Sequence, residues 1–396
     1  MSDLPRTATR EPTVVWWNDR RVRAILYQVL VLGAVVLLAF YLVTNTLDNL
    51  ESRNIATGFG FLQREAGFAV SESLIEYTPA DSYLQVLVVG LLNTLKVSFV
   101  GIILASILGT IVGVARLSRN WLVARFASVY VEGLRNIPVL LQLFFWYSLI
   151  TEALPGPRQA LHPLPGVFIS ARGLKIPEPV WQTTHLWMGA AVLVGIVGAW
   201  AVGRWAARRR ERTGQLFPTV KAGAALILGL PILVWLLGGA PTAMDVPELR
   251  GFNFQGGLTV TPEFTALLVG LVLYTGAFIA EIVRGGILAV AHGQTEAALA
   301  LGLSRGQVLR LVVLPQALRV IIPPLTSQYL NLTKNSSLAV AIGFPDLVST
   351  ANTAINQTGQ AVEGIAVIMA VYLTVSLSIS TFMNWYNQRL ALKGGR

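Results

Sequence analysis

Few residues of this 396-residue sequence have the types and spacing that catalysis requires. The chain has no cysteine, which excludes thiolate metal sites, iron–sulfur clusters and disulfides. Its three histidines, His162, His185 and His292, lie far apart in the sequence, so we expect no histidine-based metal site. The sequence also contains no phosphate-binding loop of the form GxxxxGK[ST]. We therefore expect that this chain binds no cofactor and does not hydrolyse ATP itself.

The most suggestive polar residues lie inside an apolar block late in the chain. Ser327, Asn331 and Lys334 are spaced i, i+4 and i+7, which places them on one face of a helix. Gln328 and Asn335 flank that face. Polar side chains are costly in lipid and usually face a bundle interior or a cavity. The stripe predicts either a polar path through the membrane or hydrogen bonds that join neighbouring helices, which such residues also provide.

Two acidic–basic pairs have the spacing of ion pairs within a helix. Glu281 and Arg284 are three residues apart, and Glu132 and Arg135 repeat that spacing. For both pairs we favour a structural role, while a part in gating stays open.

The composition indicates which elements must position these residues. Hydrophobic residues make up 54% of the chain and charged residues 13%, whereas soluble domains average about 25% charged residues. The apolar residues come in long blocks, and a run of about 20 spans a bilayer as a helix. We predict an all-α integral membrane protein with eight spans. The spans are at 24–44, 86–115, 123–151, 186–203, 222–240, 264–290, 318–342 and 364–386.

The basic residues predict the orientation of these spans. The net charge is +10, which would suggest nucleic acid for a soluble protein, but basic residues collect in the cytoplasmic loops of membrane proteins. With the N-terminus inside, the cytoplasmic segments hold 20 of the 30 Lys and Arg residues, and the outer segments hold six. We therefore expect both termini in the cytoplasm and no nucleic-acid partner. The polar residues 1–23 do not resemble a cleaved signal, so we expect the first span to be retained.

The loop between the sixth and seventh spans falls on the cytoplasmic side and has the signals of two short helices. Thr295 is placed to cap the first helix, and Gly302 is placed to end it. Ser304 and Gln307 have capping-box spacing for the second helix. Pro315 is expected to break or kink that helix before the seventh span begins.

The first of these helices is too short to be stable alone in water and needs a partner surface. Ala297, Ala298, Ala300 and Gly302 would give it a smooth side that another protein could approach closely. Glu296 places a negative charge near its N-terminal end, which the helix dipole favours. The alternative is an ordinary loop helix that packs on its own protein.

The same loop resembles the EAA signature of binding-protein-dependent ABC importer permeases. The EAA tripeptide 296–298 is followed after three residues by Gly302, and after nine more by a VVLP run that ends at Pro315. The family pattern has Ile where Val312 stands. In that family this loop, here residues 292–315, forms a coupling helix that docks on a cytoplasmic ATPase.

Three other stretches resemble the polar amino-acid permeases within that family. They are GLRNIPVLLQLFFWY at 133–147, YTGAFIAEIVRGGI at 274–287 and TKNSSLAVAIGFPDL at 333–347. The resemblance implies a five-helix type I ABC importer permease core, made of residues 86–151 and 263–386.

Other parts of the chain depart from that core. Residues 24–85 add an N-terminal span with a periplasmic segment, and residues 152–262 insert two further spans. Residues 1–23 and 387–396 would be the cytoplasmic N-terminus and tail. This enlarged layout is similar to that of a permease subunit of the general L-amino-acid importers.

The resemblance implies a non-catalytic permease that moves L-amino acids across the bacterial inner membrane. The implied partners are an ATPase dimer, which would hold ATP and magnesium, and a periplasmic amino-acid-binding protein. A second, related permease subunit is favoured over a second copy of this chain. The coupling residues would be Glu296, Ala297, Ala298, Gly302 and Pro315. Lys334, or the amide side chains near it, could meet the substrate carboxylate.

Two other classes of protein compete with this interpretation. Ion-driven secondary transporters usually have repeated halves, and the sequence shows no clear internal repeat. A membrane-embedded enzyme would place paired carboxylates or histidine clusters in its spans, where this sequence has only isolated ones. A requirement for ATP and a co-purifying ATPase would distinguish the importer from both.

Overall fold

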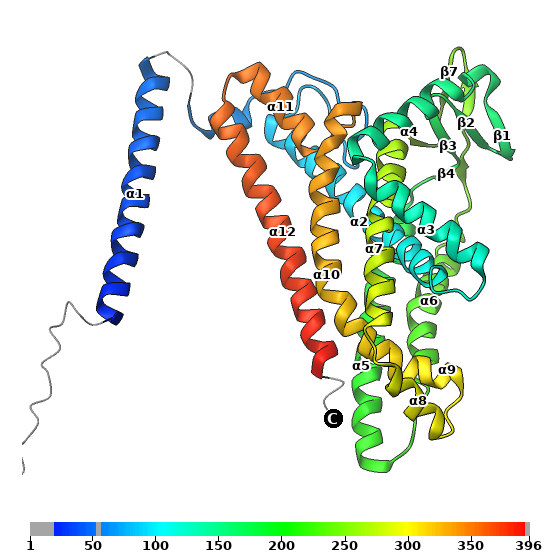
Figure 1. Ribbon diagram of the computed structural model, residues 1–396. Coiled ribbons are helices and arrows are strands. Elements are labelled where there is room, and N and C mark those ends of the chain that lie inside the picture. Colours follow the sequence, from blue (N-terminus) through cyan, green and yellow to red (C-terminus); the bar gives the residue numbers. More distant parts are fainter. Residues whose placement is uncertain (1–19, 53–56, 393–396) are drawn as a thin grey trace, which may run out of the picture. The chain divides into compact units, whose positions relative to one another are not determined.

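The computed structural model describes residues 20–52 and 57–392 (Figure 1). The expected cytoplasmic segments at 1–19 and 393–396 lie outside the described residues. The chain divides into two compact units. The first contains the described residues up to Leu91 together with Leu347–Thr374, and the second contains Leu92–Asp346 together with the described residues from Val375 onward.

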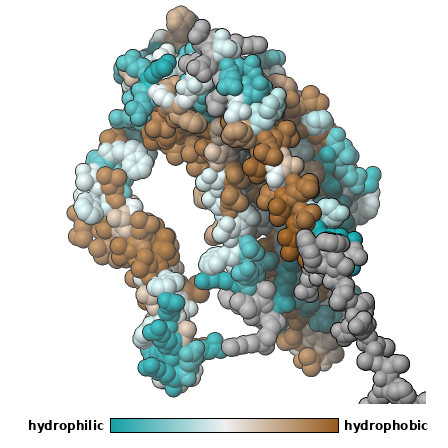
Figure 2. All heavy atoms as spheres, turned by 90° about the vertical axis from the view of Figure 1, so that its left-hand side faces the viewer, coloured by the Kyte–Doolittle hydropathy of each residue, from teal (hydrophilic) through white to brown (hydrophobic). Residues whose placement is uncertain are grey.

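Seven helices of the described residues are long and apolar enough to cross a membrane, and α4 is a shorter apolar helix. Large hydrophobic side chains lie exposed along these helices, as the brown patches in Figure 2 show. A lipid environment accounts for such exposure, because lipid tails are as apolar as leucine. The prediction of a mainly helical, multi-span membrane protein is confirmed.

The helices of the first unit begin with α1, Arg20–Ser52. After it come a 3₁₀ turn at Phe59–Gln63 and the start of α2 (Tyr83–Ala115). The unit also includes α11 (Leu347–Thr358) and the start of α12 (Ala361–Leu392). Side chains from α12 and from the connection between α11 and α12 hold the segment before α2. The carboxylate of Glu363 accepts from the Gly58 N–H at 2.6 Å, and the Gln360 amide donates to the Gly58 carbonyl at 3.1 Å.

The second unit is arranged around α7, Pro262–Leu288, which is 61% buried over its most apolar window. Helices α3, α4 and α10 pack against it. The later part of α2 approaches α7 closely because glycines stand at the contact. A Cβ atom on Gly109 would lie 2.6 Å from the Cβ of Ile279, and one on Gly113 would lie 2.7 Å from the Ala280 carbonyl oxygen. Small residues four apart are a common means of close helix packing in membranes.

The predicted span at 123–151 is wrong as a single helix. The chain forms α3 at Trp121–Asn136 and α4 at Val139–Ala153, with Ile137 in an extended conformation between them. Proline disfavours helical geometry in the residue before it, and Pro138 follows Ile137. The Gln142 side chain satisfies carbonyls at this break, because its amide donates to Leu134 O at 2.9 Å and to Ile137 O at 3.0 Å.

The insertion at 152–262 contains two long helices, as predicted, and also short strands that were not predicted. Helix α5 runs from Thr183 to Thr213 and α6 from Thr219 to Leu237. The strands are β1 Leu161–Leu164, β2 Val167–Ser170, β3 Gly173–Ile176, β4 Glu178–Pro179, β5 Met244–Asp245, β6 Glu248–Arg250, β7 Asn253–Gln255 and β8 Leu258–Val260. β1, β2, β3 and β8 form one antiparallel sheet, and β4–β5 and β6–β7 are separate pairs. Strands of two to four residues are too short to produce a recognisable alternation in the sequence.

The remaining helices follow α7. They are α8 (His292–Ala300), α9 (Arg305–Val308), a π-helical turn (Leu309–Val313), α10 (Leu314–Asn335) and a 3₁₀ segment (Ser336–Ile342). Within the second unit, α8 and α9 lie at one end, together with the turn between α5 and α6, and the strands lie at the other (Figure 1).

Candidate coupling site and polar path

Helix α8 presents the EAA motif, and its start differs from the prediction. The helix begins at His292 with Ala291 at the N-cap position, and no side chain caps it. The expectation that Thr295 caps this helix is therefore wrong, because the helix extends about one turn further toward the N-terminus. A contact between Nδ1 of His292 and Oε1 of Glu296 at 3.0 Å, one turn apart, supports the earlier start.

The end of α8 is the predicted one, at Gly302. Gly302 has a φ of +82°, in the left-handed region that favours glycine. Its N–H donates to Leu299 O at 2.9 Å, and the N–H of Leu303 donates to Ala298 O at 3.3 Å. These two bonds form a Schellman motif, which satisfies carbonyls at the helix end and turns the chain sharply.

The exposed surface of α8 differs in one residue from the prediction. Glu296, Ala297, Ala300 and Gly302 are exposed. Ala298 is only 4% exposed, so it packs inside this chain. The expectation that all the small residues form one outward surface is therefore wrong for Ala298. The EAA spacing does not distinguish an alanine that contacts a partner from one that anchors the helix.

Two exposed leucines extend this surface, and the sequence analysis did not identify them. Leu299 is 44% exposed and Leu301 is 82% exposed. Large apolar side chains in water-facing segments often mark contact sites for another protein. We define the coupling surface as Glu296, Ala297, Leu299, Leu301 and Gly302.

Helix α9 has the predicted capping box. The Gln307 N–H donates to Ser304 Oγ at 3.4 Å, and the Ser304 N–H donates to Gln307 Oε1 at 2.8 Å. Val308, 3% exposed, anchors this helix. A cavity of about 370 Å³ lies between α8, α9 and the α2–α3 connection, which contributes Arg119.

Pro315 does not break the helix, which was one of the two predicted outcomes. The helix is instead distorted by a π-helical turn at Leu309–Val313, just before Pro315. The segment from α9 through the π turn into α10 stays helical, and Pro315 stands in the first turn of α10. The Leu314 N–H donates to Leu309 O, five residues earlier, whereas the spacing in an α-helix is four residues. The wider π turn accommodates the proline ring and its missing N–H without a break.

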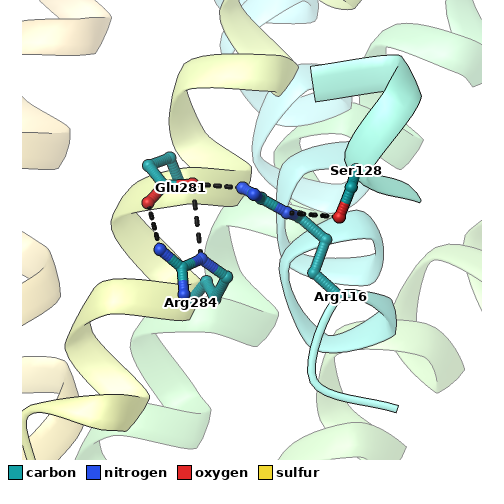
Figure 3. A network of polar contacts seen from close by, with 4 residues as sticks. All are labelled: Arg116, Ser128, Glu281 and Arg284. Carbon is teal, nitrogen blue, oxygen red and sulfur yellow. Dashed lines mark hydrogen bonds and ion pairs between the residues drawn. The ribbon is translucent and has the colours of Figure 1, made fainter. Parts of the chain in front are cut away.

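An ionic network lies near the C-terminal end of α7 (Figure 3). Glu281 accepts from Arg284 Nη2 at 2.6 Å and from Arg284 Nε at 3.3 Å, so the intrahelical pair forms. Arg116, directly after α2, donates to the same carboxylate, and its Nε lies 3.4 Å from Ser128 Oγ of α3. The network therefore joins three helices. Arg116 was not predicted from the sequence, because no local spacing connects it to Glu281.

The second acidic–basic pair behaves differently. Glu132 and Arg135 are both exposed, and the described residues contain no ion pair between them. The Arg135 guanidinium instead lies 4.9 Å from the centroid of the Phe278 ring of α7. A cation over an aromatic face is favourable, so Arg135 joins α3 to α7.

The predicted polar stripe lies on the surface of α10. Ser327, Asn331 and Lys334 are exposed on one side of the helix, and Gln328 and Asn335 are half-buried beside them. The opposite side packs inside the chain through Ile321, Ile322, Leu332 and Thr333. The exposed side of the stripe is therefore not covered by the other described helices of this chain. The alternative prediction, that these side chains join neighbouring helices through hydrogen bonds, does not hold for helices within the chain.

Asn93 is a further positioning residue that the sequence analysis missed. It is fully buried in α2, and its amide donates to Pro345 O at 2.9 Å. Pro345 belongs to the third family-like stretch, after the left-handed Gly343 (φ +79°). An asparagine within an apolar span is a signal that could have pointed to it. The described residues contain no group of three metal-ligating side chains that could hold an ion.

Comparisons with known proteins identify relatives of this chain. Residues 99–392 match the family described as binding-protein-dependent transport system inner membrane component. The chain is 50% identical to the general L-amino acid transport system permease protein AapQ of Rhizobium johnstonii, over 94% of each chain. It is 52% identical to YhdX of Escherichia coli, over 94% of this chain and 95% of YhdX.

A third relative covers almost the whole length. The glutamate/glutamine/aspartate/asparagine transport system permease protein BztB of Rhodobacter capsulatus is 42% identical over 99% of each chain. The N-terminal residues and the insertion at 152–262 thus lie within the matched lengths. The chain belongs to the family of binding-protein-dependent transport system inner membrane components.

Proposed function

We propose that this chain is a permease subunit of an ATP-driven importer of L-amino acids in the bacterial inner membrane, with both termini in the cytoplasm. AapQ and BztB, which match it over nearly all of its length, support amino acids as the substrate class. The chain itself is not the ATPase. ATP and magnesium are held by a partner ATPase dimer, and a periplasmic binding protein delivers the amino acid.

The observation that carries the coupling role is the coupling surface on α8. Its backbone is fixed by the Schellman motif at Gly302, and its apolar leucines face outward. Ala298 anchors α8 and Val308 anchors α9, so each of the two short helices has a defined position on its own protein. Such a helix can receive a displacement from a partner as a unit.

Helical continuity then provides a route for that displacement. The chain is helical from Arg305 through the π turn to Asn335. Movement of α9 therefore acts directly on α10, which carries the polar stripe. Tyr329 of α10 shares a 2.9 Å hydrogen bond with Ser106 of α2, so α2 is linked to the same motion. Packed helices with two arrangements are a usual basis for such transitions.

The polar stripe of α10 is the proposed wall of the translocation path. Lys334 would meet the substrate carboxylate, and Ser327 and Asn331 would bind polar groups along the same face. A second, related permease subunit would cover the stripe from the other side, because exposed polar side chains in a membrane need a partner or a water-filled space. The family resemblance is what favours a heterodimer of permeases over a dimer of this chain.

A pull-down of the tagged chain from mild detergent tests the coupling role. We expect an ATPase subunit and a second permease to co-purify with the wild type, and the ATPase to be lost from Gly302→Asp. No atom lies within 4 Å of a Cβ at Gly302, so the new side chain meets no steric clash, but the positive φ of +82° strains the backbone there. Gly251→Asp is the matched control. It also has a positive φ, of +69°, and open space, but it lies in the β6–β7 turn at the other end of the unit.

The outcomes separate the possible explanations. Loss of the ATPase from Gly302→Asp alone supports docking at α8. Retention in that variant, or equal loss from both variants, contradicts it. Uptake of radiolabelled amino acids into proteoliposomes tests the importer itself. Uptake driven by an ion gradient without ATP would overturn the proposal.

A further inference from the structure

The turn between α5 and α6 carries a concentrated positive charge that the proposed transport function does not use. Residues 204–221 contain six basic residues and one acidic residue, Glu211. The basic residues are Arg204, Arg208, Arg209, Arg210, Arg212 and Lys221. All of them except Arg209, which is half-buried, are exposed.

These residues extend α5 beyond the apolar part of the hairpin. Helix α5 has 31 residues and α6 has 19, which correspond to about 46 Å and 28 Å. The hydrocarbon core of a bilayer is about 30 Å thick, so α6 matches it and α5 exceeds it. These arginines follow the predicted span 186–203, and they form the last turns of α5, which ends at the left-handed Gly214.

The packing of the two helices shows which part of α5 projects. Gly223 of α6 faces Ala199 of α5, with 3.4 Å between the Ala199 Cβ and a Cβ built at Gly223. Gly203 and Thr219 line the same pocket, so the start of α6 is level with Gly203. The arginines from Arg204 onward therefore begin where the apolar span ends. A headgroup layer occupies this level in a bilayer.

Aromatic side chains at this level hold two of the arginines. The Arg204 guanidinium lies 4.3 Å from the centroid of the Trp200 ring, and that of Arg209 lies 5.3 Å from Trp205. The Trp205 ring meets Phe217 edge-on at 5.2 Å. Tryptophan concentrates at membrane–water interfaces, where its apolar ring and polar N–H are both satisfied.

A pocket lies directly beside these charges. Its volume is about 250 Å³, and Arg210, Thr219 and Phe217 line it together with small residues of α5. The N-terminus of α6 reaches the same place and has no side-chain cap. The pocket thus combines a guanidinium, a hydroxyl and an apolar ring, which suits a phosphate attached to a lipid.

We propose that the α5–α6 turn binds the phosphate headgroups of anionic phospholipids in the cytoplasmic leaflet. The basic surface has charge complementary to these lipids, and it lies where an apolar hairpin of membrane length ends. Basic clusters directly beside a transmembrane helix are attracted to anionic lipid surfaces. The site lies in the insertion and is independent of the coupling surface on α8.

The test uses the full chain in lipid nanodiscs. One set of discs contains phosphatidylcholine alone, and the other contains phosphatidylcholine and phosphatidylglycerol in equal parts. Native mass spectrometry of the chain released from the mixed discs measures which lipid it retains. We expect the wild type to retain phosphatidylglycerol in preference to phosphatidylcholine, and we expect this preference to disappear as the salt concentration rises.

Variants locate the site. The triple change Arg208→Gln, Arg210→Gln and Arg212→Gln should lower retention of phosphatidylglycerol on the order of 100-fold, since each charge contributes on the order of a fivefold effect. The same residues changed to Lys should retain most of it. The matched control removes three charges at the other end of the unit, through Arg158→Gln, Arg172→Gln and Arg250→Gln, and should leave retention unchanged.

Three results would overturn the proposal. The first is equal retention of both lipids by the wild type in low salt, which needs no variant and so does not depend on folding. The second is equal loss of phosphatidylglycerol from the triple variant and the control. The third is unchanged lipid retention in the triple variant together with loss of a co-purifying protein, which would assign the surface to an acidic protein partner.

Discussion

Arg116, directly after α2, pairs with Glu281 of α7 across 165 residues of sequence. The side chain of Arg116 is 12% exposed and that of Glu281 is 31% exposed. Because Arg284 binds the same carboxylate, Glu281 pairs with two guanidiniums at once. The pair fixes the end of α2 against α7, close to the place where the chain enters the coupling loop.

Removing this charge should weaken the protein. Glu281→Gln leaves two arginines without their shared partner, and we expect the free energy of unfolding to fall by about 1–2 kcal/mol, at the low end for charged hydrogen bonds because the site is partly exposed. Thermal unfolding in detergent measures the change. Glu248→Gln is the control, because its pair with Arg250 is 67% exposed on both sides and should contribute less than about 1 kcal/mol. Equal shifts in both variants would contradict the role of the network.

The close contact between α2 and α7 should not accept a methyl group. In Gly109→Ala the new carbon would lie 2.6 Å from two carbons of Ile279, so the helices must move apart. We expect a loss of about 1–3 kcal/mol in unfolding free energy. Gly229→Ala in α6, where no atom lies within 4 Å, should be neutral or stabilise by up to about 1 kcal/mol. A neutral Gly109→Ala would show that the helices are not in this contact.

Two asparagines should separate stability from transport. Asn93→Leu removes a buried hydrogen bond to Pro345 O and should cost about 1–3 kcal/mol of stability. Asn331→Leu changes an exposed residue of the polar stripe, so stability should stay within about 0.5 kcal/mol. Uptake by the reconstituted transporter should nevertheless fall in Asn331→Leu. Normal uptake in that variant would remove the stripe from the proposed path.

The outward leucine of the coupling surface should matter for partner binding and not for folding. Leu301 is 82% exposed, so Leu301→Ser should leave thermal unfolding unchanged. We expect the affinity for the ATPase to fall about tenfold, the effect of about 1.4 kcal/mol at an interface. A titration of purified ATPase against the permease in nanodiscs measures it. Leu164→Ser in β1, an exposed leucine at the other end of the unit, is the control.

Local features of the chain were predictable because their causes are local. The length of each apolar run indicated that the chain crosses a membrane, and long apolar helices lie at seven of the eight expected places. Their ends were less predictable, because α5 continues to Thr213, beyond the expected end at 203, and the expected span 123–151 is divided into α3 and the shorter α4. Gly302 ends α8 because it alone in that stretch takes a positive φ without strain, and the Ser304–Gln307 capping box needs only the spacing of two residues. The spacing of Ser327, Asn331 and Lys334 likewise determined that they share a face of α10.

Only the tertiary structure decided which of these residues contact the rest of the chain. Ala297 and Ala298 are identical in type, yet Ala297 faces outward and Ala298 packs inward, because the choice depends on how α8 lies against its neighbours. Pro138 interrupts a predicted span while Pro315 does not break its helix, since a π turn precedes Pro315 and Ile137 before Pro138 is extended. Arg116 reaches Glu281, and Asn93 reaches Pro345, over sequence separations that no helical period can connect. Periodicity and capping depend on neighbours in sequence, whereas these contacts depend on which helices pack together in space.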